Sequence, residues 1–279
     1  MNQNISSYEL NIYNWLKSLD INVIRSDRKI IYPKELDLYL PEHNFAIEFN
    51  GLYWHSELKI KDRNYHFNKT LKCHEKNIDL YHIFEHEWLN KSDIIKSMIL
   101  KKIRIFTNYV KTTNVRKISN DEYIDFIKEN DLFDYKNAEY MFGLFSHYLI
   151  AVCGFIHLGN NIYKVCNRCS KKDIYVEDWF NIIVDYFIKK YKPYSLICNV
   201  DLRYFDLNIF NKWKKISRIY PKFWFLTKDK KSVISRDKYN QICLSEMLKN
   251  YDFSLSIVRN MIDNGYTRIW DCGYIKMIL

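Results

Sequence analysis

The sequence predicts a mixed fold of helices and strands, α+β or α/β, divided into two domains. Hydrophobic residues make up 48% of the 279 residues and charged residues 27%, a composition that can build a globular core. Stretches with a helical apolar face alternate with short stretches whose apolar residues recur at every second position. Positive charge is concentrated late in the chain, because residues 211–238 alone hold ten Lys or Arg and two Asp. We therefore expect domains over residues 1–108 and 109–279.

The first domain is expected to run helix, antiparallel strands, helix, strand, helix. Pro41 and Gly51 end two strands that are separated by a short turn, which is typical of a hairpin. The helical patterns cover residues 8–19, 61–76 and 92–104, and the strand patterns cover residues 22–25, 29–32, 35–40, 45–50 and 79–84.

The second domain is expected to place antiparallel strands before and after one strongly amphipathic helix. The helical patterns cover residues 121–128 and 177–191, and the strand patterns cover residues 141–145, 147–157, 161–166, 194–200 and 222–227. After residue 227 the pattern is weak.

Composition excludes several classes of protein. The apolar runs are far shorter than the roughly 20 residues that a membrane span needs, so no membrane partner is expected. The N-terminal residues lack the pattern of a secretory signal, and seven scattered cysteines make an odd number for a disulfide framework. A cytoplasmic protein is therefore expected. Cys166 and Cys169 form one CxxC pair, a weak zinc signal, so structural thiols are expected there.

Two carboxylates stand out in the predicted hairpin. Alternation along the two strands can place Asp37 and Glu48 side by side, since neighbouring strands lie about 4.8 Å apart. The hairpin is otherwise apolar, and a buried carboxylate pair repels itself unless a cation lies between the two groups. A hard divalent ion with oxygen ligands would satisfy this pair. Two solvated carboxylates on a sheet surface are the plainer alternative.

Further polar side chains fall on the elements next to this hairpin. His55 follows the second strand and could serve as a general base, while His66 and Lys69 share one face of the next helix. A lysine near a scissile phosphate can neutralise developing charge. Glu9, on the polar side of the first helix, could orient a metal-bound water.

These motifs together resemble the catalytic domain of phage homing endonucleases of the EDxHD type. Those enzymes are similar to the very-short-patch repair endonucleases and belong to the PD-(D/E)xK nuclease superfamily. The resemblance covers about residues 5–105 and is carried by ELDLYLP (35–41), AIEFNGLYWH (46–55), YHFNKT (65–70) and LYHIFEHEW (80–88). It implies a central mixed sheet flanked by helices and a hydrolase that cuts DNA.

The resemblance also implies roles for individual residues. Asp37 and Glu48 occupy the two metal-binding positions, so the implied cofactor is Mg²⁺, with Mn²⁺ able to replace it. Asn50 stands where the classical pattern has a lysine, and the EDxHD and repair-type enzymes also lack that lysine and use a histidine. His55 matches that histidine, and Glu9 matches the glutamate of the first helix.

Two further candidates have less direct counterparts. His66 falls where repair-type enzymes carry an acidic residue, and Lys69 is a candidate for charge stabilisation. The implied partner is double-stranded DNA, no obligate protein partner is evident, and a phage-encoded enzyme would act in the host cytoplasm.

The second half of the chain more loosely resembles the acetyltransferase-like αβ domain found in those phage proteins. The motifs are VRK (115–117), FGL (142–144), VCNRC (165–169), NVDLR (199–203), YPKFW (220–224) and IWDCG (269–273). The glycine-rich turn that would hold a coenzyme A pyrophosphate is absent, and residues 172–176 stand in its place. We therefore expect a scaffold for DNA contact.

The segment 211–238 interleaves basic and aromatic side chains. Basic groups can neutralise phosphates and aromatic faces can stack on bases, although a solvated lysine-rich loop is an equal alternative. The predicted DNA-binding residues are Lys212, Lys214, Lys215, Arg218, Lys222, Lys228, Lys230 and Lys231. The leading hypothesis is a metal-dependent DNA endonuclease. The alternatives are a DNA-binding protein with an inactive nuclease core and an acetyltransferase active in the second domain.

Overall fold

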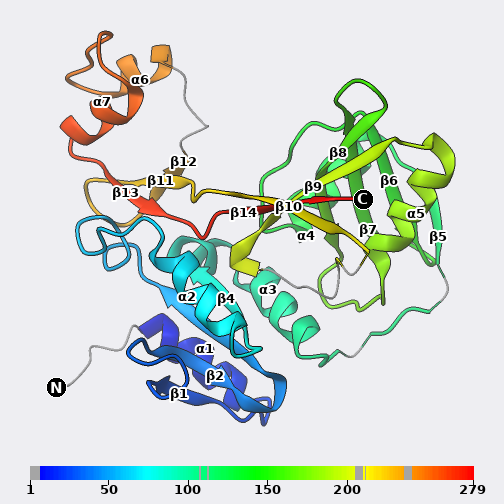
Figure 1. The fold of residues 1–279 in the computed structure, drawn as a ribbon, viewed down its shortest axis with the longest axis horizontal. Helices are drawn as coiled ribbons and strands as arrows, with labels where there is room; N and C mark the ends of the chain where they lie inside the picture. The colour runs from blue at the N-terminus through cyan, green and yellow to red at the C-terminus, as the bar shows by residue number, and fades with distance from the viewer. Residues whose placement is uncertain (1–6, 107, 112, 205–209, 211, 236–240) are drawn as a thin grey trace. The chain divides into compact units, whose positions relative to one another are not determined.

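The chain forms two compact units, each built from separate stretches of sequence (Figure 1). The structure is a computed structural model that describes residues 7–106, 108–111, 113–204, 210, 212–235 and 241–279. Unit 1 draws on residues 1–89, 201–205 and 219–274, and unit 2 on residues 90–200, 206–218 and 275–279. This division differs from the boundary expected at residue 108, because the chain returns to unit 1 twice after leaving it.

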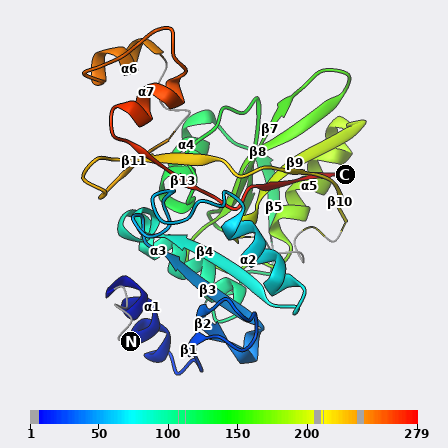
Figure 2. The same ribbon diagram turned by 60° about the vertical axis from the view of Figure 1, so that its left-hand side comes forward.

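Unit 1 is built on a four-stranded sheet in the order β1-β2-β3-β4. The first three strands pair antiparallel, as the predicted hairpin requires, and β4 is parallel to β3. Figure 2 shows the crossover helix α2 alongside β4. The elements are α1 (Ser7–Lys17), β1 (Ile24–Asp27), β2 (Leu36–Leu40), a 3-10 turn (Pro41–His43), β3 (Phe45–Asn50), α2 (Tyr65–His74) and β4 (Asp79–Phe84).

The expected strand at residues 29–32 is wrong. This stretch forms turns, because the Asp27 carboxylate accepts hydrogen bonds from the backbone amides of Lys29 and Ile30 at 3.0 and 2.9 Å. A carboxylate that binds the amides two and three residues ahead bends the backbone into a turn.

A second, smaller sheet completes unit 1. Its strands β11 (Phe223–Leu226), β12 (Val233–Ser235) and β13 (Thr267–Trp270) pair antiparallel in the order β12-β11-β13. Two short helices, α6 (Gln241–Met247) and α7 (Ile257–Asp263), lie between β12 and β13 in the chain. Phe223, Phe225 and Met261 form their common core. The sequence pattern predicted only β11 of this group.

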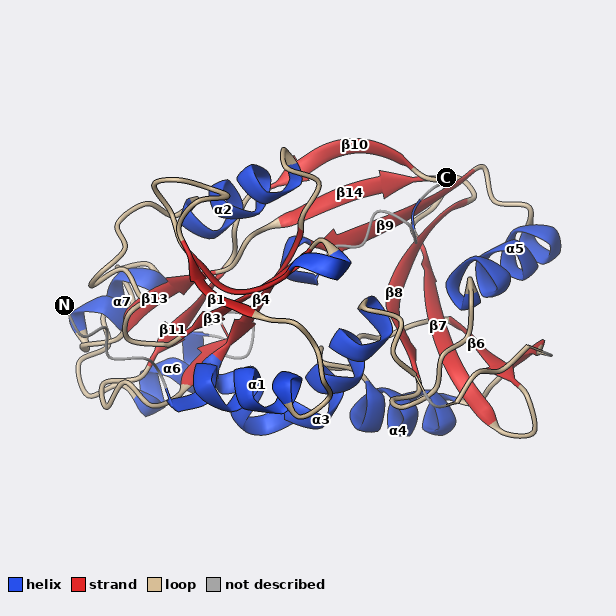
Figure 3. Ribbon diagram, turned by 90° about the horizontal axis from the view of Figure 1, so that it is seen from below, coloured by secondary structure: helices blue, strands red, loops and turns tan. Residues whose placement is uncertain are grey.

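Unit 2 contains a seven-stranded sheet in the order β10-β14-β9-β8-β7-β6-β5 (Figure 3). Strands β5 to β8 pair antiparallel in succession, and β9 joins parallel to β8. The elements are β5 (Asn114–Lys117), α4 (Asn120–Asn130), β6 (Tyr140–Phe145), β7 (Leu149–His157), β8 (Ile162–Ser170), α5 (Trp179–Tyr191), β9 (Ser195–Asp201), β10 (Lys214–Ile219) and β14 (Tyr274–Ile278). The 3-10 turn that follows β9 (Leu202–Tyr204) belongs to unit 1.

Helix α3 (Glu85–Lys102) begins in unit 1 and continues into unit 2. Its backbone departs from helical angles at Lys91 (φ −141°, ψ 38°), close to the boundary between the units. Within the described ranges, no helix has both the length and the apolar character that crossing a bilayer requires.

Candidate active site

The two carboxylates predicted to meet do lie across from each other in the sheet. Leu38 pairs with Ile47 in the antiparallel register, which places Asp37 opposite Glu48. Asp37 is half-buried, and its Oδ2 accepts a hydrogen bond of 2.8 Å from the backbone amide of Phe49. Glu48 is buried because β3 lies between two other strands and has both faces covered.

Helix α2 covers Glu48 with a polar inner face. His66, Lys69, Thr70 and Cys73 are all buried and recur at helical spacing. At one end of this face Cys73 packs in an apolar cluster, whereas nearer the start of the helix Lys69 forms an ion pair with Oε1 of Glu48. The helix thus brings a cation to the carboxylate pair.

Electrostatics within this group are dominated by burial. Burial and the neighbouring Asp37 raise the pKa of Glu48 to about 8, although Lys69 opposes the shift. Burial also raises the pKa of Asp37. Burial alone would lower the pKa of Lys69, but Glu48 and Asp37 raise it above its usual range. Two carboxyl groups therefore face a permanently charged lysine, and the set remains negative when both are ionised.

Glu9 belongs to the same group. It lies on α1, and its Oε1 is 3.6 Å from Nη2 of Arg25. Burial and the Asp37 carboxyl raise the pKa of Glu9 to about 7. A carboxyl with this pKa can accept or release a proton near neutral pH.

Three histidines of unit 1, His55, His66 and His82, lie in contact with one another. The rings of His55 and His66 are stacked with centroids 5.1 Å apart, and the ring of His82 lies 5.4 Å from His66. His82 is held between Thr70, at 2.9 Å from Nε2, and Asn50, at 3.4 Å from Nδ1. Burial and Lys69 lower the pKa of His55 to about 3, so its imidazole is neutral.

Several buried polar atoms of this group have no hydrogen-bond partner. They are Oε2 of Glu48, Oδ1 of Asn50, Nδ1 of His55 and both ring nitrogens of His66. Buried polar groups in proteins are normally paired, so this unsatisfied cluster is a candidate place for ordered water or an ion. His66 is 1% exposed. The sequence did not predict this burial, because the spacing of His66 and Lys69 on the helix also fits a solvent-exposed face.

The residues fit a hard divalent cation. Among the described residues, no three His, Cys, Asp or Glu side chains converge as a ready-made metal cluster. The side chains that could hold a cation are the two facing carboxylates, Asp37 and Glu48. Mg²⁺ in enzymes commonly uses one or two carboxylates and takes its other ligands from water and substrate phosphates. The unpartnered Oε2 of Glu48 and the excess negative charge agree with that donor set.

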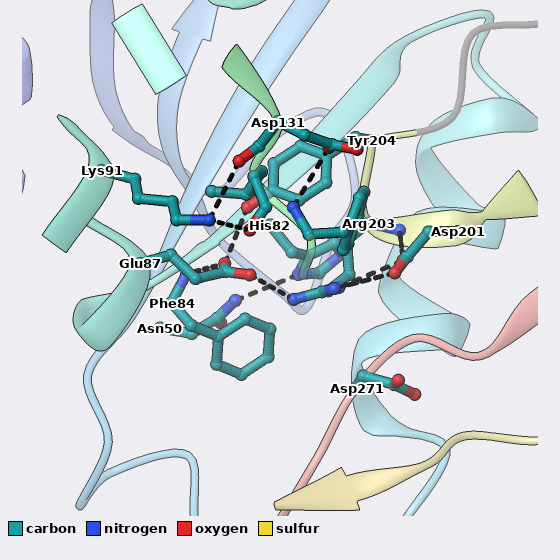
Figure 4. Close-up of polar contacts among 12 residues, drawn as sticks. Asn50, His82, Phe84, Glu87, Lys91, Asp131, Asp201, Arg203, Tyr204 and Asp271 are labelled. Atoms are coloured by element: carbon teal, nitrogen blue, oxygen red, sulfur yellow. Dashed lines mark hydrogen bonds and ion pairs between the residues drawn. The ribbon is translucent and has the colours of Figure 1, made fainter. Parts of the chain in front are cut away.

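Sequence reasoning missed a buried ionic cluster in the same unit (Figure 4). Arg203, 2% exposed, donates to Oε1 of Glu87 at 2.5 Å and to Oδ2 of Asp201 at 2.8 Å. Tyr204 donates to Glu87 at 2.7 Å. Asp271, whose pKa burial and Asp201 raise to about 7, accepts hydrogen bonds from nearby backbone amides. Asp201 and Arg203 of the NVDLR motif and Asp271 of the IWDCG motif thus lie in the interior of unit 1.

The basic segment divides between the units. Lys222, Lys228, Lys230 and Lys231 belong to unit 1 and are exposed. The other four lie in unit 2: Lys212, Lys214 and Lys215 are exposed, Arg218 is half-buried, and Lys212 pairs with Asp185 at 3.0 Å. Residues 211 and 236–238 of the segment lie outside the described residues.

Most of the interleaved aromatics are core residues, and a buried ring is not accessible for stacking on a base. Trp213 is buried and stacks on Phe180 with ring centroids 5.8 Å apart. Phe223 and Phe225 are buried as well, whereas Tyr220 is 64% exposed. The lysines thus border hydrophobic residues that face inward.

Unit 2 shows neither a zinc centre nor an open phosphate turn among its described residues. Cys166 and Cys169 are three apart on β8, so they face opposite sides of the strand, and both are free. The backbone amides of residues 171, 172, 173 and 175 donate to Ile150 O, Asn130 Oδ1, Ser97 Oγ and Asn108 O. These amides occupy the place of the missing glycine-rich turn and are already paired inside the chain.

Comparisons with known proteins find likenesses for both parts of the chain. No family model and no curated protein matches. Among solved structures, the chain is similar to the catalytic domain of the homing endonuclease I-Bth0305I, with 28% identity over 35% of this chain and 94% of that domain and a TM-score of 0.30.

Other solved structures with similarity to this chain are acetyltransferases. The ribosomal-protein-S18-alanine N-acetyltransferase of Escherichia coli is 9% identical over 60% of this chain and 93% of its own, with a TM-score of 0.36. The IAA acetyltransferase of Bacillus cereus is 8% identical over 60% of this chain and 99% of its own, with a TM-score of 0.31. All three TM-scores are low, so we infer the chemistry of the candidate site from its own side chains.

Proposed function

We propose that this chain is a metal-dependent endonuclease of the EDxHD homing-endonuclease kind that hydrolyses phosphodiester bonds in double-stranded DNA. One observation carries the proposal: Asp37 and Glu48 face each other on adjacent strands, and Lys69 pairs with Glu48. Paired carboxylates held by a lysine at the edge of a histidine cluster suit the hydrolysis of a phosphate ester.

Asp37 and Glu48 would hold the cation, Mg²⁺ or Mn²⁺. When bound, the cation would supply positive charge that polarises the scissile phosphate and lowers the pKa of a water. Lys69 fixes the position of Glu48 and adds a second positive charge close to the phosphate.

Proton transfer falls to His55 and Glu9. The neutral imidazole of His55 can accept a proton, and the negative charge of a bound phosphate would raise its low pKa toward the usual range. Glu9, with a pKa of about 7, can orient a water and exchange a proton with it. His66 stacks on His55 and restricts the orientation of that ring.

The exposed lysines of unit 1 are our candidates for the first DNA contacts. Lys228, Lys230 and Lys231 lie on the turn between β11 and β12, and Nζ of Lys230 lies 4.6 Å from the ring centre of Tyr53, two residues before His55. Lysines placed this close to a catalytic loop can bind phosphates that flank the scissile bond. Lys214 and Lys215 are the corresponding candidates on unit 2.

The two alternative functions have weaker support. An acetyltransferase needs free backbone amides for the coenzyme A pyrophosphate, and those at residues 171–175 named above are occupied. A protein that only binds DNA has no need for two facing carboxyl groups and a buried lysine in one group.

The test is cleavage of a supercoiled plasmid library with randomised inserts, incubated with Mg²⁺, with Mn²⁺ or with EDTA. Nicked or linear product that forms with metal and not with EDTA supports the proposal. DNA binding with no product in either metal would favour the binding protein with an inactive core.

A further inference from the structure

The loop that carries His55 lies between β3 and α2. Within this loop the amide of His55 donates to Gly51 O at 3.0 Å, and the amide of Ser56 donates to Tyr53 O at 3.3 Å. The amides of Lys59 and Ile60 both donate to Ser56 O at 2.9 Å, and the Leu52 amide donates to Glu85 Oε2 at 2.8 Å. The loop is thus a series of turns that belongs to no helix or sheet of its own. Its position must therefore be fixed by contacts from elsewhere.

Strand β13 of the small sheet supplies those contacts. Ser56 and Ile269 form an isolated antiparallel bridge. Glu57 donates from its amide to Arg268 O at 2.8 Å, and its carboxylate accepts from the Arg268 amide at 3.1 Å and from Nε at 2.8 Å. Both carboxylate oxygens are thus used by one residue that is 211 positions away in sequence.

An apolar cluster lies beneath this polar junction. Leu52 from the loop, Phe84 from β4, and Leu226 and Ile269 from the small sheet are all fully buried together. The loop is therefore held both by the packing of Leu52 in this apolar cluster and by the Glu57–Arg268 pair. Both partners of the pair are partly exposed, with side-chain exposures of 21% and 30%, so the pair's main contribution is geometry rather than folding energy.

We propose that Glu57 and Arg268 are positioning residues for His55. The small sheet would thus contribute to catalysis through Arg268 of β13, which binds Glu57 in the loop of His55. This inference rests on the proposed nuclease function. Loss of the pair would allow the loop to shift, and a displacement of about 1 Å in a reacting group can slow a reaction by about 100-fold. Affinity for DNA, which lysines provide, should change little.

The test combines Glu57→Gln with a matched control. Glu57→Gln keeps size and shape but removes the charge that orients Arg268, and Asp263→Asn removes an exposed partner of Arg259 on α7 in the same unit. Under single-turnover conditions with Mn²⁺, Glu57→Gln should slow cleavage about 10- to 100-fold, with DNA affinity within about twofold of wild type. Arg268→Lys should retain more activity than Arg268→Met. Asp263→Asn should behave as wild type.

A double variant separates positioning of His55 from other effects. If the pair acts through His55, adding Glu57→Gln to His55→Ala should change the residual rate by less than about twofold. Equal reductions in rate in both backgrounds, or no reduction in either, would overturn the inference.

Hydrogen exchange gives a readout that needs no activity. Glu57→Gln should accelerate exchange at the amides of His55, Ser56 and Glu57, while Asp263→Asn should not. If the wild type cuts no DNA, the proposed function fails, and unchanged exchange in Glu57→Gln would separately refute the positioning of this loop.

Discussion

Lys69→Met tests the electrostatic account of the site, because it removes a positive charge that contacts Glu48. Lys69 is 2% exposed and Glu48 3%, so water cannot replace the missing partner. Removing one member of a buried ion pair typically costs about 3–5 kcal/mol. Glu48 can avoid this cost only by taking up a proton.

That proton makes the expected destabilisation depend on pH. The folded-state pKa of Glu48 is already raised to about 8, and without Lys69 it must rise further. A carboxyl with a raised folded-state pKa destabilises the protein increasingly as pH rises above its unfolded value. At about pH 6, where Glu48 is neutral, we expect only the roughly 1–2 kcal/mol that altered packing costs. Above about pH 8 the destabilisation should grow by about 1.4 kcal/mol per pH unit until the variant's higher pKa is reached, so it should be larger by about that amount at about pH 9.

Urea unfolding followed by circular dichroism at both pH values, with EDTA present, measures this difference. The control is Lys76→Met, which changes an exposed lysine just after the same helix and should leave stability within about 0.5 kcal/mol. Equal destabilisation of Lys69→Met at the two pH values would refute the coupling between Lys69 and Glu48.

Three further predictions concern rate, DNA binding and stability. His55→Ala should slow cleavage about 10²–10⁴-fold without weakening Mn²⁺ binding, and a rate within about threefold of wild type would contradict its role in proton transfer. Because cation binding must displace the proton held with a Glu48 pKa of about 8, wild-type cleavage at subsaturating metal should rise with pH up to that value, and a rate that does not rise would contradict the raised pKa of Glu48. Replacing Lys228, Lys230 and Lys231 with Ala should make the slope of log K against log salt shallower by about 0.9 for each phosphate that the variant no longer neutralises, for all sequences alike, and an unchanged slope would remove this turn from the interface. Arg203→Met should lower unfolding stability by about 3–5 kcal/mol, because it leaves buried carboxylates unpaired, whereas Lys212→Met, which removes an exposed ion pair, should unfold like the wild type. Similar midpoints for the two variants would contradict the account of the ionic cluster.

Local patterns predicted the centre of unit 1 well. The strands at 45–50 and 79–84 have the expected bounds, because each is an apolar run between clear turn signals. The opposition of Asp37 and Glu48 followed from hairpin alternation. The register of a hairpin depends on the apolar pattern of its two strands and on the turn between them, and both are local features of the sequence.

What the sequence could not predict depends on contacts between distant residues. Arg203 and Glu87 are 116 positions apart, and nothing near either one indicates the pairing. The same is true of Glu57 and Arg268. The aromatic side chains of segment 211–238 were predicted to stack on bases because basic residues surround them in sequence, yet one of them, Trp213, is buried against Phe180. The short helices α6 and α7 lack the length at which a helical pattern becomes clear.

Cleavage by Asp37→Asn, measured together with its DNA affinity, tests the central claim most directly. Asparagine retains a carbonyl oxygen that can accept the amide of Phe49, so the strand should keep its shape while the candidate metal ligand loses its charge. The account predicts that cleavage with Mg²⁺ or Mn²⁺ is abolished and that DNA affinity stays within about twofold of wild type, since Asp37 contacts no phosphate in the proposed arrangement. Cleavage by Asp37→Asn within about threefold of the wild-type rate would contradict the claim that these carboxylates form the catalytic centre.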